Sequence, residues 1–256
     1  CVGCVDGMLV KIKTPSRREA GNVRAYFSGH YYHMGLNIQA VCDHECRFIF
    51  FAVAAPGSSS DVNAFSRTQL ASYVDRLSDN RYLIGDAYTP SEHMLTPIGG
   101  VRGKNSASDN YDFFVSQLRI KIEQAFGRLS NKWRFLKSPI QLNLRNASKA
   151  VMATALLHNY CSDLSELVAA EASDSVSEVL AFSVRGSSNA GSHHLYYLPS
   201  DPTSSETISI SGVSVLRDKT VEFIQQTALS RPQHNRIRRL ALNEQAFNNG
   251  DLQHSS

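Results

Sequence analysis

Two apolar runs on either side of a short polar turn constrain the fold more than any other feature of the chain. Residues 35–42 and 47–55 are rich in Val, Ile and Phe, and Asp43-His44-Glu45 lies between them. Runs of this length and composition around a turn are typical of an antiparallel hairpin. The chain is therefore expected to contain a β-sheet.

Further strands are predicted before and after this hairpin. Residues 2–12 alternate in a β-like manner around Asp6-Gly7, which predicts two short strands that meet at a turn. Residues 81–86 form a short apolar run that ends in Gly85-Asp86, and this pattern predicts another strand. Both aspartates then lie at the ends of predicted strands.

Two long helices are predicted after these strands. The second spans about residues 147–167, where small residues suit close packing against a sheet. A shorter helix is expected to begin at Asp61, which can serve as its N-cap. Strands and helices in this order predict an α/β fold with a mixed sheet flanked by helices. The first long helix has apolar residues spaced three or four apart, as in a helix that packs one face on a core: Val115, Leu118, Ile122, Phe126, Leu129, Trp133 and Leu136.

The chain is expected to consist of one folded domain followed by a flexible tail. Its 256 residues are 42% hydrophobic, which is enough to bury a core. We assign residues 1–168 to the folded domain, the Ser-rich residues 169–215 to a flexible linker, and residues 216–256 to a weakly helical basic tail. The Arg236-x-Arg238-Arg239 cluster of this tail is interpreted as a solvated surface, with a nucleic-acid contact or a localisation signal as alternatives.

Positive charge gathers on the first long helix. The formal net charge of the chain is only +3, but Glu123 is the only acid between Asp112 and Asp163. Clustered cations beside an apolar stripe favour a polyanion as partner, and a solvated helix face is the alternative. The longest apolar stretch, residues 48–55, is too short to span a bilayer, so no membrane partner is expected. The cations near Glu123 are Arg119, Lys121, Arg128, Lys132 and Arg134.

The cysteines leave two interpretations open. Their number, 5, is odd, which argues against a secreted disulfide framework and for a reducing compartment. Cys1-x-x-Cys4 and Cys42-x-x-x-Cys46 could together form a four-thiolate zinc site. Buried or incidental thiols are the favoured interpretation, because the first pair lies in a strand-like pattern and the second brackets the predicted hairpin turn.

Three carboxylates stand out as a chemical set. Asp6 and Asp86 follow apolar strand residues, and Glu123 lies on the long helix. They can converge if the two strands are neighbours and the helix crosses the sheet beside them. Convergent carboxylates repel one another unless a cation neutralises them, and oxygen ligands favour Mg²⁺ or Mn²⁺. Two such ions would suit a phosphodiester displacement. The alternative is that each aspartate merely caps a turn.

Five sequence blocks stand out, and three of them contain these acids: CVDG at residues 4–7, PGSSSD at 56–61, LIGDAYTP at 83–90, SQLRIKIEQAFGRLSNKWRFL at 116–136 and LLHNYC at 156–161. Together they resemble the catalytic domain of PIF/Harbinger-type DNA transposases over about residues 1–165. That family is similar in fold to ribonuclease H and the retroviral integrases. The resemblance therefore implies an RNase H-like (retroviral integrase-like) mixed sheet flanked by helices.

The resemblance also implies roles for individual residues. The catalytic and metal-binding triad is expected to be Asp6, Asp86 and Glu123, and the 36 residues between the last two agree with the usual gap of the family. Asp61 matches a further acid that recurs in the family and is expected to assist the metal site. His158, beside Asn159, is interpreted as a satisfied core histidine, with a contact behind the metal site as the alternative.

The expected activity is that of a metal-dependent DNA endonuclease and transposase. It would hydrolyse phosphodiester bonds at transposon ends and transfer strands, with two Mg²⁺ or Mn²⁺ ions as cofactors. The partner is DNA, bound by the helix cations, together with a separate DNA-binding accessory protein and further copies of the chain on DNA. The nucleus is the expected location. Two alternatives remain: a domesticated or inactive module that binds DNA or protein, and a structural module held by cysteine-bound zinc.

Overall fold

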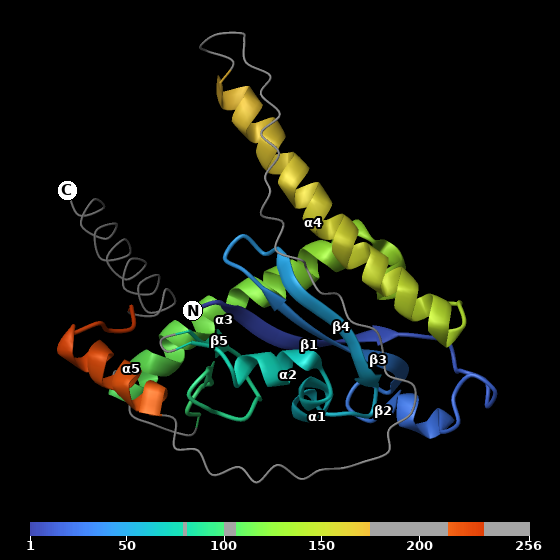
Figure 1. The fold of residues 1–256 in the computed structure, drawn as a ribbon, viewed down its shortest axis with the longest axis horizontal. Coiled ribbons are helices and arrows are strands. Elements are labelled where there is room, and N and C mark those ends of the chain that lie inside the picture. The colour runs from blue at the N-terminus through green and yellow to red at the C-terminus, as the bar shows by residue number, and fades with distance from the viewer. Residues whose placement is uncertain (79–80, 100–105, 175–214, 233–256) are drawn as a thin grey trace, which may run out of the picture.

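The computed structural model describes residues 1–78, 81–99, 106–174 and 215–232, with the side chains of residues 165–174 not described (Figure 1). Most of the predicted Ser-rich linker and the Arg236-x-Arg238-Arg239 cluster lie outside these residues. Within them, a mixed sheet is flanked by helices, and the predicted α/β fold class is confirmed.

The sheet is built around the predicted hairpin. Its long strands are β1 (Gly3–Lys11), β3 (His33–Cys42) and β4 (Phe48–Pro56), and its short strands are β2 (Phe27–Ser28), β5 (Leu83–Ile84) and β6 (Met94–Leu95). Strand β3 pairs antiparallel with β1, β2 and β4. On its other side, β1 pairs parallel with β5, which pairs parallel with β6. The hairpin prediction for residues 35–55 is therefore confirmed, and β1 joins the two halves of the sheet.

The prediction of two short strands around Asp6-Gly7 is wrong. Residues 3–11 form one nine-residue strand, β1, that continues through both positions. Asp6 pairs with Ala40 and Gly7 with Gln39, within an uninterrupted antiparallel ladder along β3. The ladder outweighs the turn preference of an Asp-Gly pair, because it satisfies the backbone groups of both residues.

Helices cover both faces of this sheet (Figure 1). On one face lie α3 (Ala107–Lys132), the 3₁₀ helix η2 (Arg134–Lys137) and α4 (Leu144–Asp174); on the other lie α1 (Asp61–Ser66) and α2 (Gln69–Val74), while the 3₁₀ helix η1 (Val23–Tyr26) precedes β2. Both long helices were predicted. The periodic residues Val115, Ile122 and Leu129 are buried on α3, whereas Leu118 is 48% exposed.

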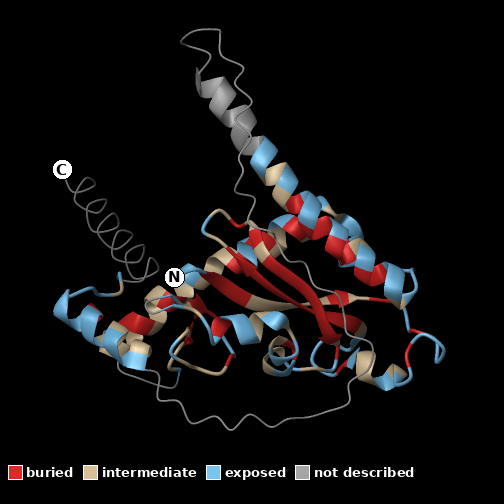
Figure 2. Ribbon diagram, in the orientation of Figure 1, coloured by how far each residue is buried: buried red, intermediate tan, exposed pale blue. Residues whose placement is uncertain are grey.

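The hydrophobic core has one part on each face of the sheet. Ile38, Phe51 and Ile84 pack with Ile122 and other residues of α3 and α4. On the opposite face, the smaller cluster includes Val5, Val41 and Leu83 together with Val74 of α2 and Tyr88. Figure 2 shows that most strand residues are buried between the helices, whereas the middle of β1 is only partly buried. In the described part of the chain, no helix has the length and apolar character needed to cross a membrane.

The described part of the predicted tail forms α5 (Val215–Gln226), which packs beside α3 (Figure 1). Ile224 is buried in the larger core cluster. The backbone N–H of Arg231 donates to Oδ1 of Asn110 over 2.8 Å, and its guanidinium pairs with Asp109. Residues 215–231 therefore lie against the N-terminal turns of α3.

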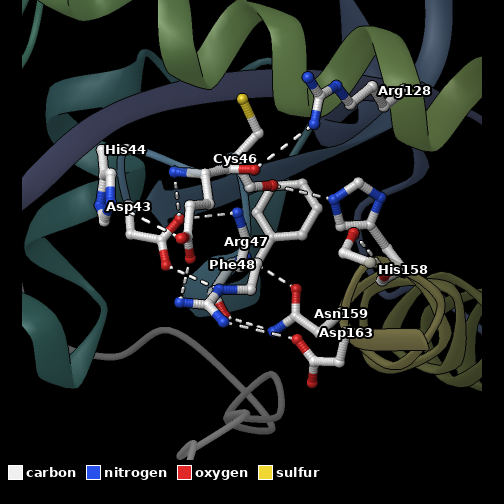
Figure 3. Close-up of polar contacts among 11 residues, drawn as sticks. Asp43, His44, Cys46, Arg47, Phe48, Arg128, His158, Asn159 and Asp163 are labelled. Atoms are coloured by element: carbon white, nitrogen blue, oxygen red, sulfur yellow. Dashed lines mark hydrogen bonds and ion pairs between the residues drawn. The ribbon is translucent and has the colours of Figure 1, made fainter. Parts of the chain in front are cut away.

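The turn between β3 and β4 is attached to α4 by His158 and Asn159 (Figure 3). Nε2 of His158, which is 3% exposed, donates to the carbonyl oxygen of Cys46 over 2.9 Å. Asn159 accepts from the N–H of Phe48 and donates to its C=O, at 2.8 and 2.7 Å. Burial lowers the pKa of His158, so the ring stays neutral. The interpretation of His158 as a satisfied core histidine is confirmed, and the pair fastens the hairpin to α4.

We predict that Asn159→Ala destabilises the fold by about 2 kcal/mol, because it leaves both backbone groups of Phe48 without their partner. Urea unfolding of the two proteins measures the difference. Asn131→Ala is the control, because its side chain accepts only an exposed bond from Lys137 and its removal should change stability by less than about 0.5 kcal/mol. Equal stability of Asn159→Ala and the parent protein would contradict this account of the hairpin.

Candidate active site

Neighbouring parallel strands bring Asp6 and Asp86 to the same place on the sheet. Cys4 of β1 is paired with Ile84 of β5, and each aspartate lies two residues further along its chain. Successive side chains alternate between the two faces of a sheet, so Asp6 is on the face of Cys4. Asp86 lies two residues beyond the end of β5, and its carboxylate meets Arg119 of α3 on the same face, at 2.8 Å. Helix α3 covers the face of Cys4 and Ile84, since these two residues belong to the core cluster that contains Ile122.

Helix α3 adds Glu123 to this pair through a cation. Nη1 of Arg119 lies 2.8 Å from Oδ2 of Asp86, and its Nη2 lies 3.1 Å from Oε1 of Glu123. The Sγ of Cys4 donates to the carbonyl oxygen of Leu118 over 3.1 Å, which places this part of α3 against β1. Glu123, the only acid among the cations of this helix, is therefore paired with Arg119, which lies one helical turn before it.

The Arg119 side chain is more buried than its two partners. It is 21% exposed, whereas Asp86 and Glu123 are each 51% exposed. Its Nε is buried and has no hydrogen-bond partner within the described structure. Ion pairs this open to solvent contribute roughly 0.5 kcal/mol each. The guanidinium therefore neutralises the two carboxylates, and breaking both ion pairs costs little free energy.

Asp6 carries a charge that the fold does not fully compensate. The pKa of Asp6 is raised to about 6, mainly by burial and to a smaller extent by the neighbouring carboxylates of Asp61 and Asp86, while the Gly7 N–H and Arg119 oppose the shift. The Gly7 N–H donates to Oδ1 of Asp6 over 2.9 Å. Asp6 is thus a partly buried acid, close to other acids, that a further cation would stabilise in its ionised form.

Asp61 is not the N-cap of α1, so that part of the prediction is wrong. The N-cap is Ser60, whose side chain accepts from the N–H of Asn63. The Asp61 carboxylate turns instead toward the sheet, where its Oδ1 accepts from Nδ2 of Asn37 and Nε2 of Gln39, at 3.0 and 3.1 Å. The two amide groups donate hydrogen bonds to the carboxylate, whereas the N-terminus of α1 is already capped by Ser60.

A polar network on the face of α1 and α2 was not predicted. Gln39 also donates to Oδ1 of Asn37 over 2.8 Å and accepts from the hydroxyl of Tyr88 over 2.7 Å. One signal was present in the sequence, because Asn37 and Gln39 lie two residues apart in an otherwise apolar strand and so share one face. Tyr88 had no such signal, since its contact with β3 depends on the tertiary fold.

The five cations predicted to bind nucleic acid do not form one cluster. Arg119 lies among the carboxylates. At 100° per residue, Lys121, Arg128 and Lys132 lie on a different flank of α3, roughly opposite Arg119 around the helix axis. Arg128 accordingly reaches the carbonyl oxygen of Glu45 in the β3–β4 turn, 3.4 Å away. Arg134 is exposed in η2, beyond the end of α3. One predicted cation therefore lies at the acidic site and four lie elsewhere.

The cysteines do not form the zinc site that was considered as an alternative. Burial raises the pKa of both Cys4 and Cys42 to about 12, so these thiols are protonated and are not ready metal ligands. Cys4 and Cys46 donate to oxygen atoms of α3 residues, Leu118 and Gln124. Cys1 is exposed, unlike the other three. The favoured interpretation of buried thiols is confirmed for Cys4, Cys42 and Cys46.

The donor chemistry of the acidic site fits a hard divalent cation. Carboxylate oxygens are the ligands that Mg²⁺ and Mn²⁺ prefer, and a bound cation would favour the ionised form of Asp6, whose pKa is raised mainly by burial. Among the described residues, no three His, Cys, Asp or Glu side chains are grouped closely enough to hold one metal ion. The site as described is closed by the guanidinium of Arg119, which would have to release Asp86 and Glu123 for a metal to bind them.

Comparison with known proteins points to one family. The sequence model of a family described as DDE superfamily endonuclease matches residues 5–159, which is more than half of the chain. The match begins at β1 and ends in α4 at Asn159, so it contains all three carboxylates of the site. No curated protein and no solved structure matches the chain.

We predict that Asp6→Asn stabilises the metal-free protein at pH 7 but not at pH 4. The folded-state pKa of Asp6, about 6, exceeds its ordinary value of 3.8, so the folded protein binds more protons than the unfolded chain between these values. Stability should therefore fall as the pH rises from about 4 to about 6, and the loss at neutral pH is up to about 3 kcal/mol.

Urea unfolding in a chelating buffer between pH 4 and pH 8 measures this effect. Asp75→Asn, which changes an exposed acid at the end of α2, is the control and should behave as the parent protein. A lower stability of Asp6→Asn than of the parent protein at pH 7 would show that the charge of Asp6 is compensated in the fold.

Proposed function

Because the chain belongs to the family of DDE superfamily endonucleases, we propose that it is a divalent-metal-dependent DNA endonuclease and transposase. It hydrolyses phosphodiester bonds at transposon ends and transfers the cut strand to target DNA. One observation carries the proposal: Arg119 joins Asp86 to Glu123 on the face of the sheet that also presents Asp6. An acidic site with its own removable counter-ion suits a reaction that begins with cation binding.

Asp6, Asp86 and Glu123 are the residues proposed to hold the metal, which is Mg²⁺ or Mn²⁺, as two ions. Asp61, whose carboxylate is held by Asn37 and Gln39 on the other face of the sheet, is proposed to assist the site through its charge near Asp6 and not as a direct ligand. The metal, when bound, would activate the attacking oxygen and stabilise charge at the reacting phosphate. Asp6 must lose its proton to act as a ligand, and its raised pKa predicts that metal binding weakens below about pH 6.

Arg119 has two roles in this proposal. Without metal, it neutralises Asp86 and Glu123 and so limits the repulsion among the acids. Once released, its guanidinium remains tethered beside the carboxylates and can donate two hydrogen bonds to a DNA phosphate. The same side chain would thus stabilise the empty site and orient the substrate in the occupied one.

The other cations are proposed to bind the DNA backbone away from the site of cleavage. Lys121, Arg128 and Lys132 share a flank of α3, and Arg134 follows in η2. Contacts from such side chains to phosphates are independent of base sequence, and they weaken with added salt. They would hold and align the duplex, while sequence recognition would come from a separate DNA-binding accessory protein.

The order of the five sequence blocks supports assignment to the PIF/Harbinger type within the family. Such an enzyme would act on chromosomal DNA in the nucleus, with further copies of the chain assembled on the same DNA. A second candidate function is a domesticated, inactive module that binds DNA or a protein. This candidate is compatible with the pairing of Arg119, which neutralises two of the carboxylates without any metal.

We predict that the purified chain nicks supercoiled DNA in the presence of Mg²⁺ or Mn²⁺, and that Asp86→Asn and Glu123→Gln each lower the rate by at least about 100-fold. The reason is that each substitution removes a charged oxygen ligand while it preserves the side-chain shape. Chelator abolishes nicking, and the exposed control Asp75→Asn retains it.

DNA binding by the same variants separates the two candidate functions. Under our proposal, Asp86→Asn and Glu123→Gln bind DNA at least as tightly as the parent protein, because each loses a negative charge near the phosphates. Nicking that persists in both variants would contradict the assignment of the triad. DNA binding by the parent protein without metal-dependent nicking would favour the inactive module.

A further inference from the structure

We infer that Gln39 and Tyr88 are positioning residues. They lie on the opposite face of the sheet and fix the distance between Asp6 and Asp86. This inference rests on the proposed function, because it assigns to a buried network the task of holding two metal-binding aspartates. None of its members needs to touch the metal or the DNA. The argument comes from the contacts of Gln39, from two glycines that adjoin the aspartates and from the fixed orientation of Tyr88.

Gln39 is the centre of the network. Its side chain is fully buried, and each of its polar atoms has a partner. Nε2 donates to Oδ1 of Asn37 and Oδ1 of Asp61, at 2.8 and 3.1 Å, and Oε1 accepts from the Tyr88 hydroxyl at 2.7 Å. The partners of Nε2 are acceptors in this arrangement and Tyr88 is a donor, so the amide has one favourable orientation. Satisfied buried networks of this kind rigidify the segments they join.

Two glycines allow the network to rest directly on the backbone beside the aspartates. A Cβ added to Gly7 would lie 2.0 Å from Oδ1 of Asp61, and one added to Gly85 would lie 2.4 Å from Cδ2 of Tyr88. Gly7 follows Asp6 and Gly85 precedes Asp86. The Asp61 carboxylate and the Tyr88 ring therefore occupy the places that side chains next to the two aspartates would otherwise fill.

Tyr88 connects the network to the segment that carries Asp86. It lies two residues after Asp86, is 6% exposed, and packs edge-on against Phe65 of α1 with ring centroids 5.3 Å apart. Its hydroxyl donates to Oε1 of Gln39 over 2.7 Å. Because Gln39 is paired with Gly7 in the β1–β3 ladder, the Tyr88 hydrogen bond ties the Asp86 segment to the strand of Asp6.

Outer partners of this kind matter in metal sites, because they orient ligands that are otherwise free to rotate. Their removal lowers metal affinity by about 10-fold to 100-fold. A network that served only the hydrophobic core would affect stability and leave the affinity for metal unchanged. The two roles therefore differ in a measurable way.

The test uses Tyr88→Phe, which removes only the hydroxyl, and Gln39→Met, which removes the amide. Tyr111→Phe is the matched control, since it also deletes a buried tyrosine hydroxyl, bonded to the carbonyl oxygen of Thr96 at 3.1 Å. Calorimetric titration of Mn²⁺ into each purified protein at about pH 7.5 measures the metal affinity, and urea unfolding in parallel measures the stability. We expect roughly 10-fold weaker Mn²⁺ binding for Tyr88→Phe and Gln39→Met, and unchanged binding for Tyr111→Phe.

A second measurement needs no metal. Hydrogen exchange of the backbone amides between Leu83 and Pro90 should become faster in Tyr88→Phe than in the parent protein. Asn159→Ala is the control, because it loosens the β3–β4 hairpin and should leave exchange in residues 83–90 unchanged relative to global stability. Exchange that is equally fast in both variants would overturn the positioning role.

The two measurements separate this inference from the proposed function. If the parent protein binds no Mn²⁺, the proposed function fails, and hydrogen exchange still decides whether Gln39 and Tyr88 hold the Asp86 segment. If the parent protein binds Mn²⁺ and Tyr88→Phe binds it equally well, the positioning role is wrong while the proposed function stands. Equal losses in Tyr88→Phe and Tyr111→Phe would likewise overturn it, because they would reflect general destabilisation.

Discussion

Repulsion among carboxylates is the constraint on which the arrangement of this site depends. Asp6 and Asp86 come from adjacent strands and Glu123 from the helix that covers them, and such a gathering needs positive charge to be stable. Arg119 supplies it for two of the three acids. Asp6 forms no ion pair in the described structure, and burial, with a smaller contribution from the neighbouring carboxylates, raises its pKa. The fold thus holds an acidic site at a cost that a bound cation would remove.

The sheet separates the chemistry of this site from its support. One face presents the carboxylates to α3, and the other buries the polar network of Gln39 against α1 and α2. Strand β1 contributes to both faces, with Asp6 on one and the side-chain-free position of Gly7 on the other. Rigid support beneath a reacting site is what metal chemistry requires, because small displacements of a ligand weaken binding considerably.

The sequence predicted the fold class correctly, and it proposed a candidate triad without the contacts that surround it. The hairpin and the long helices were visible because their apolar patterns match the periods of buried strands and helices. Asp6, Asp86 and Glu123 were proposed as a triad from their places in the predicted elements and from the sequence blocks around them. The strand through Asp6-Gly7 was missed, because local turn preference says nothing of a ladder formed with a partner far along the chain.

Contacts made only in the tertiary structure account for the other differences. The spacing of Arg119 and Glu123 permits a pair on one helix, but the second bond of Arg119, to Asp86, depends on how α3 crosses β5. Asp61 was expected to cap α1, and Ser60 does so in its place. The burial of Tyr88 on Gly85 likewise follows from packing and not from any local pattern.

The most direct test of this account is a crystal structure of the chain grown with Mn²⁺, with the anomalous signal of the metal recorded. The account predicts anomalous peaks in contact with Asp6, Asp86 and Glu123, and an Arg119 side chain that has left both Asp86 and Glu123. Crystals in which no metal binds at saturating Mn²⁺, while Arg119 keeps both ion pairs, would contradict the central claim that these carboxylates form a metal site.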